Sequence, residues 1–243
     1  SSAASDVYKR QGPVSSKLVP KTSLSARILY LIYISLTFLE TVALKLAGMP
    51  LYDALVTTFA TVCTGGFAVK NLSLASYGLP ACEIIVTVFM LLCSVNFAVF
   101  FLVLTGRAKQ ALGSDELRFF LVAVLLSVGL IFWNILPLYD TPGHALRDTF
   151  FQVATVVSTT GFSTADFALW PTLSQFVLVL LMFLGGCAGS TAGGIKCARI
   201  LLLGRCARRS LGRLCHPRSV KVVKLDGKAV DETTLNTVLV FFT

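Results

Sequence analysis

The chain has 243 residues, of which 55% are hydrophobic and 14% are charged, and its mean hydropathy is +0.79. Soluble globular domains carry about 25% charged residues, so the composition excludes that class and predicts an integral membrane protein. The apolar segments described below predict that its fold class is all-α. The net charge of +9 arises from basic stretches at residues 9–27, 107–118 and 196–228. Because these stretches flank apolar segments, they argue against nucleic-acid binding and are predicted to be cytoplasmic.

The first half of the chain contains two membrane-length apolar segments with a short one between them. Residues 27–47 and 80–104 are each long enough to cross about 30 Å of hydrocarbon. Residues 51–62 are too short to span, which is typical of a re-entrant helix. A Thr64-Gly65-Gly66-Phe67 turn follows this short segment. The order predicts a membrane helix, a pore helix, a turn and a second membrane helix.

The second half repeats this pattern. Residues 117–138 form a predicted span, residues 143–157 a short helix, and residues 172–203 another span. A Thr159-Thr160-Gly161-Phe162 turn follows the short helix. The starts of the two short helices match at an offset of 91 residues, but the turns match at an offset of 95. The difference is about one helical turn, so the second pore helix is predicted to be one turn longer with the same face inward.

Five segments follow from this repeat. Residues 1–16 are a polar segment interpreted as an unrelated remnant, residues 17–109 and 110–204 are helix–pore-helix–helix units, residues 205–230 are a basic cytoplasmic linker, and residues 231–243 begin a further, truncated unit. Both ends of each unit are expected on the cytoplasmic side, with the turns facing outside. The basic linker sets topology in the favoured interpretation, and docking of an acidic partner or lipid headgroups is the alternative.

The two turns are candidate selectivity-filter segments. Ion filters are loops whose carbonyls replace the hydration shell of an ion, and such loops need glycine for unusual backbone angles. The short helices would also direct the negative ends of their dipoles at a cation. The alternative is a pair of extracellular turns that only cap helices. The candidate filter residues are Cys63, Thr64, Gly65, Gly66 and Phe67 in one turn and Ser158, Thr159, Thr160, Gly161 and Phe162 in the other.

A glycine-rich stretch interrupts the last predicted span. Five glycines between residues 185 and 194 should break a helix, and a flexible loop beneath a filter is a natural gate. The alternative is a small-residue packing face made by Gly185, Gly189 and Gly193. A phosphate-binding loop is excluded because Ile195 separates Gly194 from Lys196. The candidate gate residues are Gly185, Gly186, Gly189, Ser190, Thr191, Gly193, Gly194 and Lys196, the last of which either repels cations or marks the cytoplasmic boundary.

Other polar residues receive structural interpretations. Charges within spans mark functional sites by default, but a structural role is favoured for Glu40, Lys45, Asp53, Arg147 and Asp148. The seven cysteines include no C-x-x-C motif and the chain has two histidines, so no zinc, redox or histidine metal site is predicted. This lack of a catalytic cluster also argues against an enzyme or scaffold.

These residues resemble the Trk/Ktr/HKT superfamily of potassium transporters, and most closely its TrkH-type membrane subunits. The matching stretches are residues 51–67, 153–164 and, most specifically, 185–196 with 200–203 behind them. The resemblance covers residues 17–243. One departure is Cys63, because the filter more usually carries serine there, as the second copy does at Ser158. A filter uses backbone oxygens, so little change in selectivity is expected.

The resemblance implies four units around one pseudo-fourfold pore, of which this chain matches the second, the third and the start of the fourth. It implies potassium uptake through a filter with one key glycine per unit, here Gly66 and Gly161, above a gate at residues 185–194. Potassium would be the transported ion, without a covalent cofactor or enzymatic activity. It further implies a homodimer, a cytoplasmic nucleotide-binding regulatory subunit of the TrkA type, and a multi-pass location in the bacterial cytoplasmic (inner) membrane. The alternative is a sodium- or proton-coupled carrier with discontinuous helices and a midplane site, although the same-direction repeats count against it.

Overall fold

The computed structural model describes residues 22–215 and 222–242, so the polar segment predicted at residues 1–16 lies outside the described residues. The first unit contains α2 (Thr22–Leu46), α3 (Leu51–Val62), η1 (Ser73–Tyr77), α4 (Pro80–Ser94), α5 (Phe97–Leu104) and α6 (Ala108–Leu112). The second contains α7 (Asp115–Ile135), η2 (Leu136–Leu138), α8 (Pro142–Val157), η3 (Phe167–Leu169), α9 (Thr172–Leu184) and α10 (Cys197–Cys215). A hairpin of β1 (Lys224–Leu225) and β2 (Lys228–Ala229) and then α11 (Glu232–Phe242) follow.

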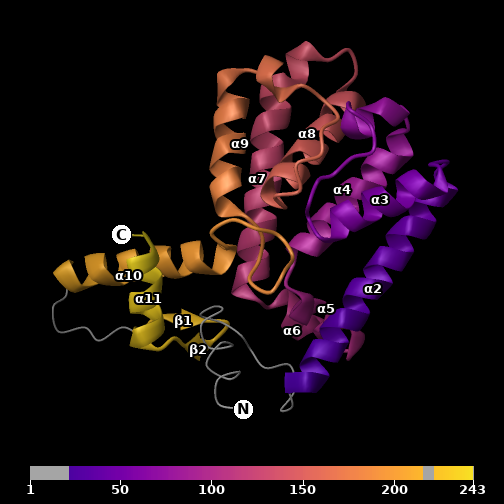
Figure 1. The fold of residues 1–243 in the computed structure, drawn as a ribbon. Helices are drawn as coiled ribbons and strands as arrows, with labels where there is room; N and C mark the ends of the chain where they lie inside the picture. The colour runs from indigo at the N-terminus through magenta and orange to yellow at the C-terminus, as the bar shows by residue number, and fades with distance from the viewer. Residues whose placement is uncertain (1–21, 216–221, 243) are drawn as a thin grey trace.

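The two short helices are confirmed at the predicted positions. Helix α3 has 12 residues and α8 has 16, so α8 is four residues longer, as the two offsets require. Each begins beside a proline, Pro50 before α3 and Pro142 at the first position of α8. Proline suits a helix start because its fixed φ fits and its missing N–H would have no helical partner. In Figure 1 α3 lies beside α2 and α4, and α8 lies beside α7 and α9.

The two longest helices expose many apolar side chains. Within residues 22–215 and 222–242, two helices are long and apolar enough to span a membrane, Ala26–Leu46 and Asp115–Leu138. Large apolar side chains on both are exposed, which fits contact with lipid. They include Tyr30, Leu31, Phe38 and Leu39 on α2 and Leu125, Leu126, Leu130 and Trp133 on α7.

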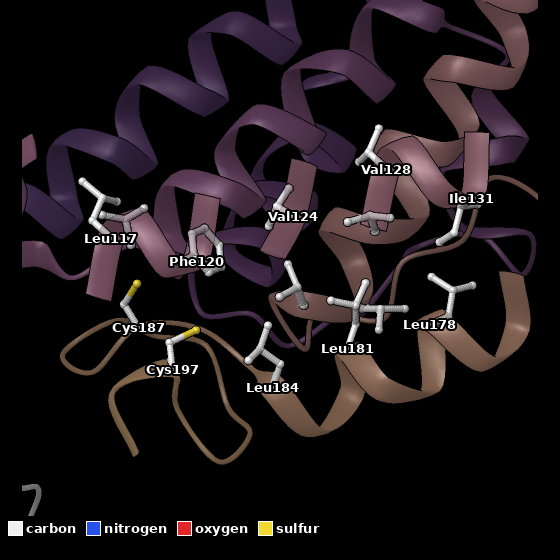
Figure 2. Close-up of a cluster of buried hydrophobic side chains, with 14 of the residues drawn as sticks. Leu117, Phe120, Val124, Val128, Ile131, Leu178, Leu181, Leu184, Cys187 and Cys197 are labelled. Carbon is white, nitrogen blue, oxygen red and sulfur yellow. The ribbon is translucent and has the colours of Figure 1, made fainter. Parts of the chain in front are cut away.

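The opposite face of α7 packs against α9. Buried residues recur every three or four positions on α7, the spacing of one helix face. Figure 2 shows this row, Leu117, Phe120, Val124, Val128 and Ile131, facing Leu178, Leu181 and Leu184 of α9. Cys187 and Cys197 lie at the end of the same cluster, so the core of the second unit extends to the glycine-rich stretch.

The span predicted over residues 80–104 is wrong as one continuous helix. Helices α4 and α5 meet at a bend of 94° around residues 95 and 96, and only as a pair do they reach membrane length. The side chain of Asn96 caps α5, because its Oδ1 accepts the N–H of Ala98 at 2.8 Å. At the end of α4, the carbonyl of Ser94 accepts the N–H of Cys187 at 2.8 Å. The helix therefore breaks where a backbone carbonyl at its end bonds to a distant segment instead of to the next helical turn.

The span predicted over residues 172–203 is interrupted, as the glycine content suggested. Helix α9 ends at Leu184 and α10 starts at Cys197. The packing-face alternative does not hold, because Gly185, Gly189 and Gly193 lie outside helices and the first two have φ of 67° and 74°. Figure 1 shows α10 running crosswise to α9 and away from the bundle.

Beyond the bundle, α10 packs with the hairpin and α11 around a small separate core. Leu202 and Cys206 of α10 meet Val223, Leu225, Leu235 and Val238. The residues predicted as a basic linker thus continue α10 to Cys215 and form the hairpin at residues 224–229. A hairpin with strands of two residues is too small to be stable alone, so this core holds it beside α10.

Candidate functional site

Each short helix ends in a turn with the same backbone path. In the first turn (residues 63–67), the carbonyl of Ala60 accepts the N–H groups of Gly65 at 2.7 Å and Gly66 at 3.3 Å. In the second turn (residues 158–162), the carbonyl of Thr155 accepts those of Thr160 at 3.0 Å and Gly161 at 3.3 Å. The two turns therefore repeat each other in these backbone hydrogen bonds.

This path determines where the carbonyl groups point. In a trans peptide the C=O of one residue lies opposite the N–H of the next, and the described chain contains no cis peptide bond. Because the amides of Gly65 and Gly66 point back at α3, the carbonyls of Thr64 and Gly65 point away from it. The carbonyls of Thr159 and Thr160 point away from α8 for the same reason. Each turn thus presents backbone oxygens beyond the end of its helix.

The two turns lie against each other. A Cβ atom at Gly66 would be 1.9 Å from the carbonyl oxygen of Thr160, closer than any side chain permits. Gly66 also has φ of 67°. Gly161 has φ of 90°, but a Cβ there would meet nothing within 4 Å. Gly66 is therefore required by both space and backbone angle, whereas Gly161 is required by angle alone.

Hydroxyl groups brace the second turn from behind. Oγ1 of Thr155 donates to the carbonyl of Phe162 at 2.9 Å and accepts the N–H of Gly161 at 3.1 Å. The hydroxyls of Ser158 and Thr160 are 2.7 Å apart. The first turn has Ala60 and Cys63 at the positions of Thr155 and Ser158, so it lacks these braces. Sequence reasoning missed Thr155, although its replacement by alanine in the other copy was a visible signal.

The two phenylalanines of the turns have different surroundings. Phe162 is 2% exposed and packs in the core shared by the two units. Phe67, at the equivalent position, is 77% exposed. The structure therefore gives Phe162 a packing role and leaves Phe67 at the surface.

The glycine loop (residues 185–196) lies directly against both turns. Oγ1 of Thr159 accepts the N–H of Gly193 at 2.7 Å. Oγ1 of Thr64 donates to the carbonyl of Thr191 at 3.1 Å. Thr64 and Thr159 are equivalent residues of the two copies, so each turn contacts the loop through the threonine at the same position. In Figure 1 the loop crosses the molecule below the short helices α3 and α8.

The loop also fits into the break between α4 and α5. The carbonyl of Cys93 accepts the N–H of Thr191 at 3.3 Å, and the carbonyl of Gly189 accepts the N–H of Phe97 at 3.1 Å. Its two ends cross closely, since a Cβ at Gly185 would lie 2.3 Å from the carbonyl oxygen of Gly193. The ammonium group of Lys196 donates to the carbonyl of Ala192, so its charge lies on the loop itself.

Two of the charged residues for which the sequence favoured a structural role, Asp53 and Asp148, accept hydrogen bonds from tyrosines. Asp53 accepts the hydroxyl of Tyr77 at 2.8 Å, and Asp148 accepts that of Tyr139 at 2.9 Å. Burial is the main cause of a raised pKa at Tyr77, and the Asp53 carboxylate adds to it. In the same way, burial and then the Asp148 carboxylate raise the pKa of Tyr139 to about 12.

The remaining charged residues differ in their surroundings. Arg147 of α8 forms a 2.9 Å ion pair with Glu83 of α4, which joins the two units. Lys45 is exposed near the end of α2, where it can reach the membrane surface. Glu40 is fully buried on the inner stripe of α2 with Leu36 and Leu44. In the described part of the chain, no three His, Cys, Asp or Glu side chains gather as a metal site would need.

Comparison with known proteins gives consistent matches along the chain. The family model TrkH, described as a cation transport protein, matches residues 7–243. The Trk system potassium uptake proteins TrkH of Salmonella typhimurium and Escherichia coli K12 are 37% and 36% identical over 238 residues, or 95% of this chain. The crystal structure of the potassium transporter TrkH from Vibrio parahaemolyticus superposes with a TM-score of 0.86 at 35% identity, over 94% of this chain and 50% of that one. The chain spans about half the length of the curated relatives, 49% of each.

Proposed function

Because this chain belongs to the TrkH family of cation transport proteins, we propose that it forms part of a potassium uptake pathway. The family is one of cation transporters, which is not an enzyme class. Family membership makes the protein a multi-pass membrane protein, and its apolar helices fit that location. The observation that carries the proposal is the pair of matching turns, both of which meet the glycine loop through a threonine.

In this proposal the two turns are filter segments. The carbonyls of Thr64, Gly65, Thr159 and Thr160 would replace water around a dehydrated potassium ion. Helices α3 and α8 end at the turns, so their C-terminal dipole ends, each about −0.5 charge, favour a cation there. Ion selection would therefore need backbone groups only, and no covalent chemistry takes place.

The glycine loop would be the gate. It lies beneath both turns, is bonded to Thr64 and Thr159, and contains backbone angles that only glycine adopts easily. In the position described here it would close the path below the filter. The ammonium group of Lys196 on the loop would add a barrier to cations.

A coupled carrier with a midplane site is the second candidate. The broken helices α4–α5 and α9–α10 are a feature that carriers also use. The two units run in the same direction along the chain, however, whereas many carriers are built from inverted repeats. A gated filter therefore fits better.

The assembly follows from the same proposal. We expect a homodimer in the bacterial inner membrane with a nucleotide-binding regulatory subunit of the TrkA type on the cytoplasmic side. Helix α10, the hairpin and α11 project from the bundle (Figure 1) and carry arginines such as Arg205 and Arg209. This region is the candidate contact for that subunit.

The filter assignment is tested by substitution of the two key glycines. In a complete transporter that carries this chain, Gly66→Asp or Gly161→Asp should abolish rescue of a potassium-uptake-deficient strain at low potassium. Each variant places a carboxylate on a turn at a backbone angle that favours glycine, and at Gly66 the side chain would also collide with the carbonyl of Thr160. Gly143→Asp is the matched control, since it adds the same charge to an exposed first-turn position of α8 and should retain rescue. Full rescue by both filter variants would overturn the assignment.

A further inference from the structure

We infer that Glu116 is a positioning residue that holds the glycine loop beneath the two turns, and that Asp115 ties this hold to α10 and the hairpin. The inference rests on the proposed gate function of that loop. It concerns the first turn of α7, which neither the sequence patterns nor the family resemblance singled out.

Glu116 binds both sides of the loop through one oxygen. Its Oε1 accepts the N–H of Ala188 at 2.5 Å and the N–H of Ala198 at 3.2 Å. Ala188 lies in the loop, and Ala198 lies in the first turn of α10. Residues 189–197, which include both contacts with the turns, lie between these two amides. A single carboxylate thus binds both ends of the segment that contacts the two turns.

An ordinary helix-start role does not explain this geometry. An acidic residue at a helix N-terminus is favoured by the dipole alone and is typically solvated. Glu116 is instead 6% exposed, and its carboxylate is directed at amides of other segments. Hydrogen bonds to a charged acceptor are about twice as strong as neutral ones, so its loss should release the loop.

Asp115 connects the same turn of α7 to the cytoplasmic elements. Its Oδ2 lies 2.9 Å from Nη2 of Arg205 on α10 and accepts the N–H of Asp226 at 3.1 Å. Its own N–H donates to Oδ1 of Asp226 at 2.7 Å. Asp226 lies in the turn of the hairpin between β1 and β2.

The two neighbours therefore couple the loop to α10. Ala198 and Arg205 belong to one rigid helix, and each is bonded to one of the two acidic residues of α7. A displacement of α10 away from α7 would break both bonds and free the loop at Ala198. The resting position of α10 and the closed position of the loop are held by the same pair of carboxylates.

The test measures potassium flux without a regulatory subunit. A complete transporter carrying this chain would be reconstituted in liposomes, with potassium as the permeant cation. Glu116→Ala should raise this flux about ten-fold or more, the effect of losing a charged hydrogen bond. The flux of Glu116→Gln should lie between those of wild type and Glu116→Ala, because the glutamine Oε1 still accepts hydrogen bonds but is uncharged. Asp115→Asn should raise the flux less, and no rise would overturn the coupling to α10.

Glu83→Gln is the matched control, since Glu83 is also a buried carboxylate in the first turn of a helix but pairs with Arg147 instead of the loop. It should leave the regulator-free flux unchanged. A flux within two-fold of wild type in Glu116→Ala, or an equal rise in Glu83→Gln, would overturn the proposed hold.

Hydrogen–deuterium exchange separates the hold from general folding and from conduction. Peptides covering residues 185–198 should exchange faster in Glu116→Ala, whereas peptides of α8 should not. Faster exchange in both regions would mean that Glu116 supports the fold as a whole and would overturn the inference. If the wild-type protein carries no potassium, the proposed function fails, and the exchange of residues 185–198 still decides whether Glu116 holds the loop.

Discussion

Gly66 and Gly161 are equivalent residues with unequal constraints. Both have positive φ, but only Gly66 lies so close to the carbonyl oxygen of Thr160 that any Cβ would displace it. The sequence predicted that both positions need glycine, because each follows a short helix in a repeated turn. It did not predict the difference, because the close contact joins residues 94 positions apart whose distance depends on how the units pack.

This difference predicts unequal effects of alanine. Gly161→Ala should retain reduced potassium uptake, because an L-residue in the left-handed region costs about 1–2 kcal/mol and meets no atom there. Gly66→Ala should abolish uptake, because the turn of the other unit must move. Rubidium uptake, normalised to membrane expression, measures both. Equal activities of the two variants would contradict the described contact between the turns.

Tyr139 gives a second prediction at this scale. Its pKa in the folded protein, raised to about 12 by burial and by Asp148, lies above the unfolded value of 10.0. Its stabilising bond is therefore fully present below pH 10 and is lost as pH rises through about 12. Tyr139→Phe should lower the free energy of unfolding by about 1 kcal/mol at pH 8, and by less above pH 11.

Thermal unfolding in detergent at the two pH values measures this change. Tyr52→Phe serves as the control, because Tyr52 is exposed and should lose little at either pH. A loss at Tyr139 that stays constant up to pH 12 would argue against the bond to Asp148.

Among the elements, the short helices were the most predictable and the broken ones the least. Pro50 and Pro142 mark the starts of α3 and α8, and the turns mark their ends, so local sequence fixed both lengths. Residues 80–104 contain no glycine and no internal proline, and local sequence favours one helix there. The break at Asn96 arises because a distant loop bonds to Cys93, Ser94 and Phe97, which no local pattern encodes.

The break predicts a measurable role for Asn96. Asn96→Ala removes the cap of α5 and should destabilise the protein by about 1 kcal/mol. The peptide covering residues 185–194 should also exchange its amide hydrogens faster, because Gly189 packs beside Asn96. Asp166→Ala removes a similar cap from the exposed η3 and provides the control. Unchanged exchange of the loop in Asn96→Ala would show that the cap acts on α5 alone.

At the scale of the whole molecule, the two units share an architecture but not a chemistry. The second turn is braced by hydroxyls, and the first has alanine and cysteine in their place. Composition and the offsets of the repeat predicted the helical membrane fold and the duplicated unit. They did not predict Glu116 or the contacts of Thr64 and Thr159 with the loop, because these depend on packing between segments far apart in the sequence.

A bound ion should stabilise the assembled pore. In a complete transporter, potassium at about 100 times its dissociation constant should raise the free energy of unfolding by about 2.7 kcal/mol, with less effect from sodium. Gly161→Asp should remove this gain, whereas Gly143→Asp should keep it. Thermal unfolding in potassium, sodium and choline chloride measures the effect. Equal stabilisation of the Gly161→Asp variant would place the ion elsewhere.

The thiol of Cys63 gives the first turn a site for selective chemical labelling. Among the cysteines whose side chains the structure describes, Cys63 is exposed, whereas Cys82, Cys93, Cys187, Cys197 and Cys206 are buried. In the proposed orientation, with the turns facing outside, a membrane-impermeant maleimide or a charged thiol reagent added from outside should react first beside Gly65 and Gly66. The native sequence thus supplies a label at one wall of the proposed filter, and a fluorophore or spin probe can report on that wall without any engineered residue.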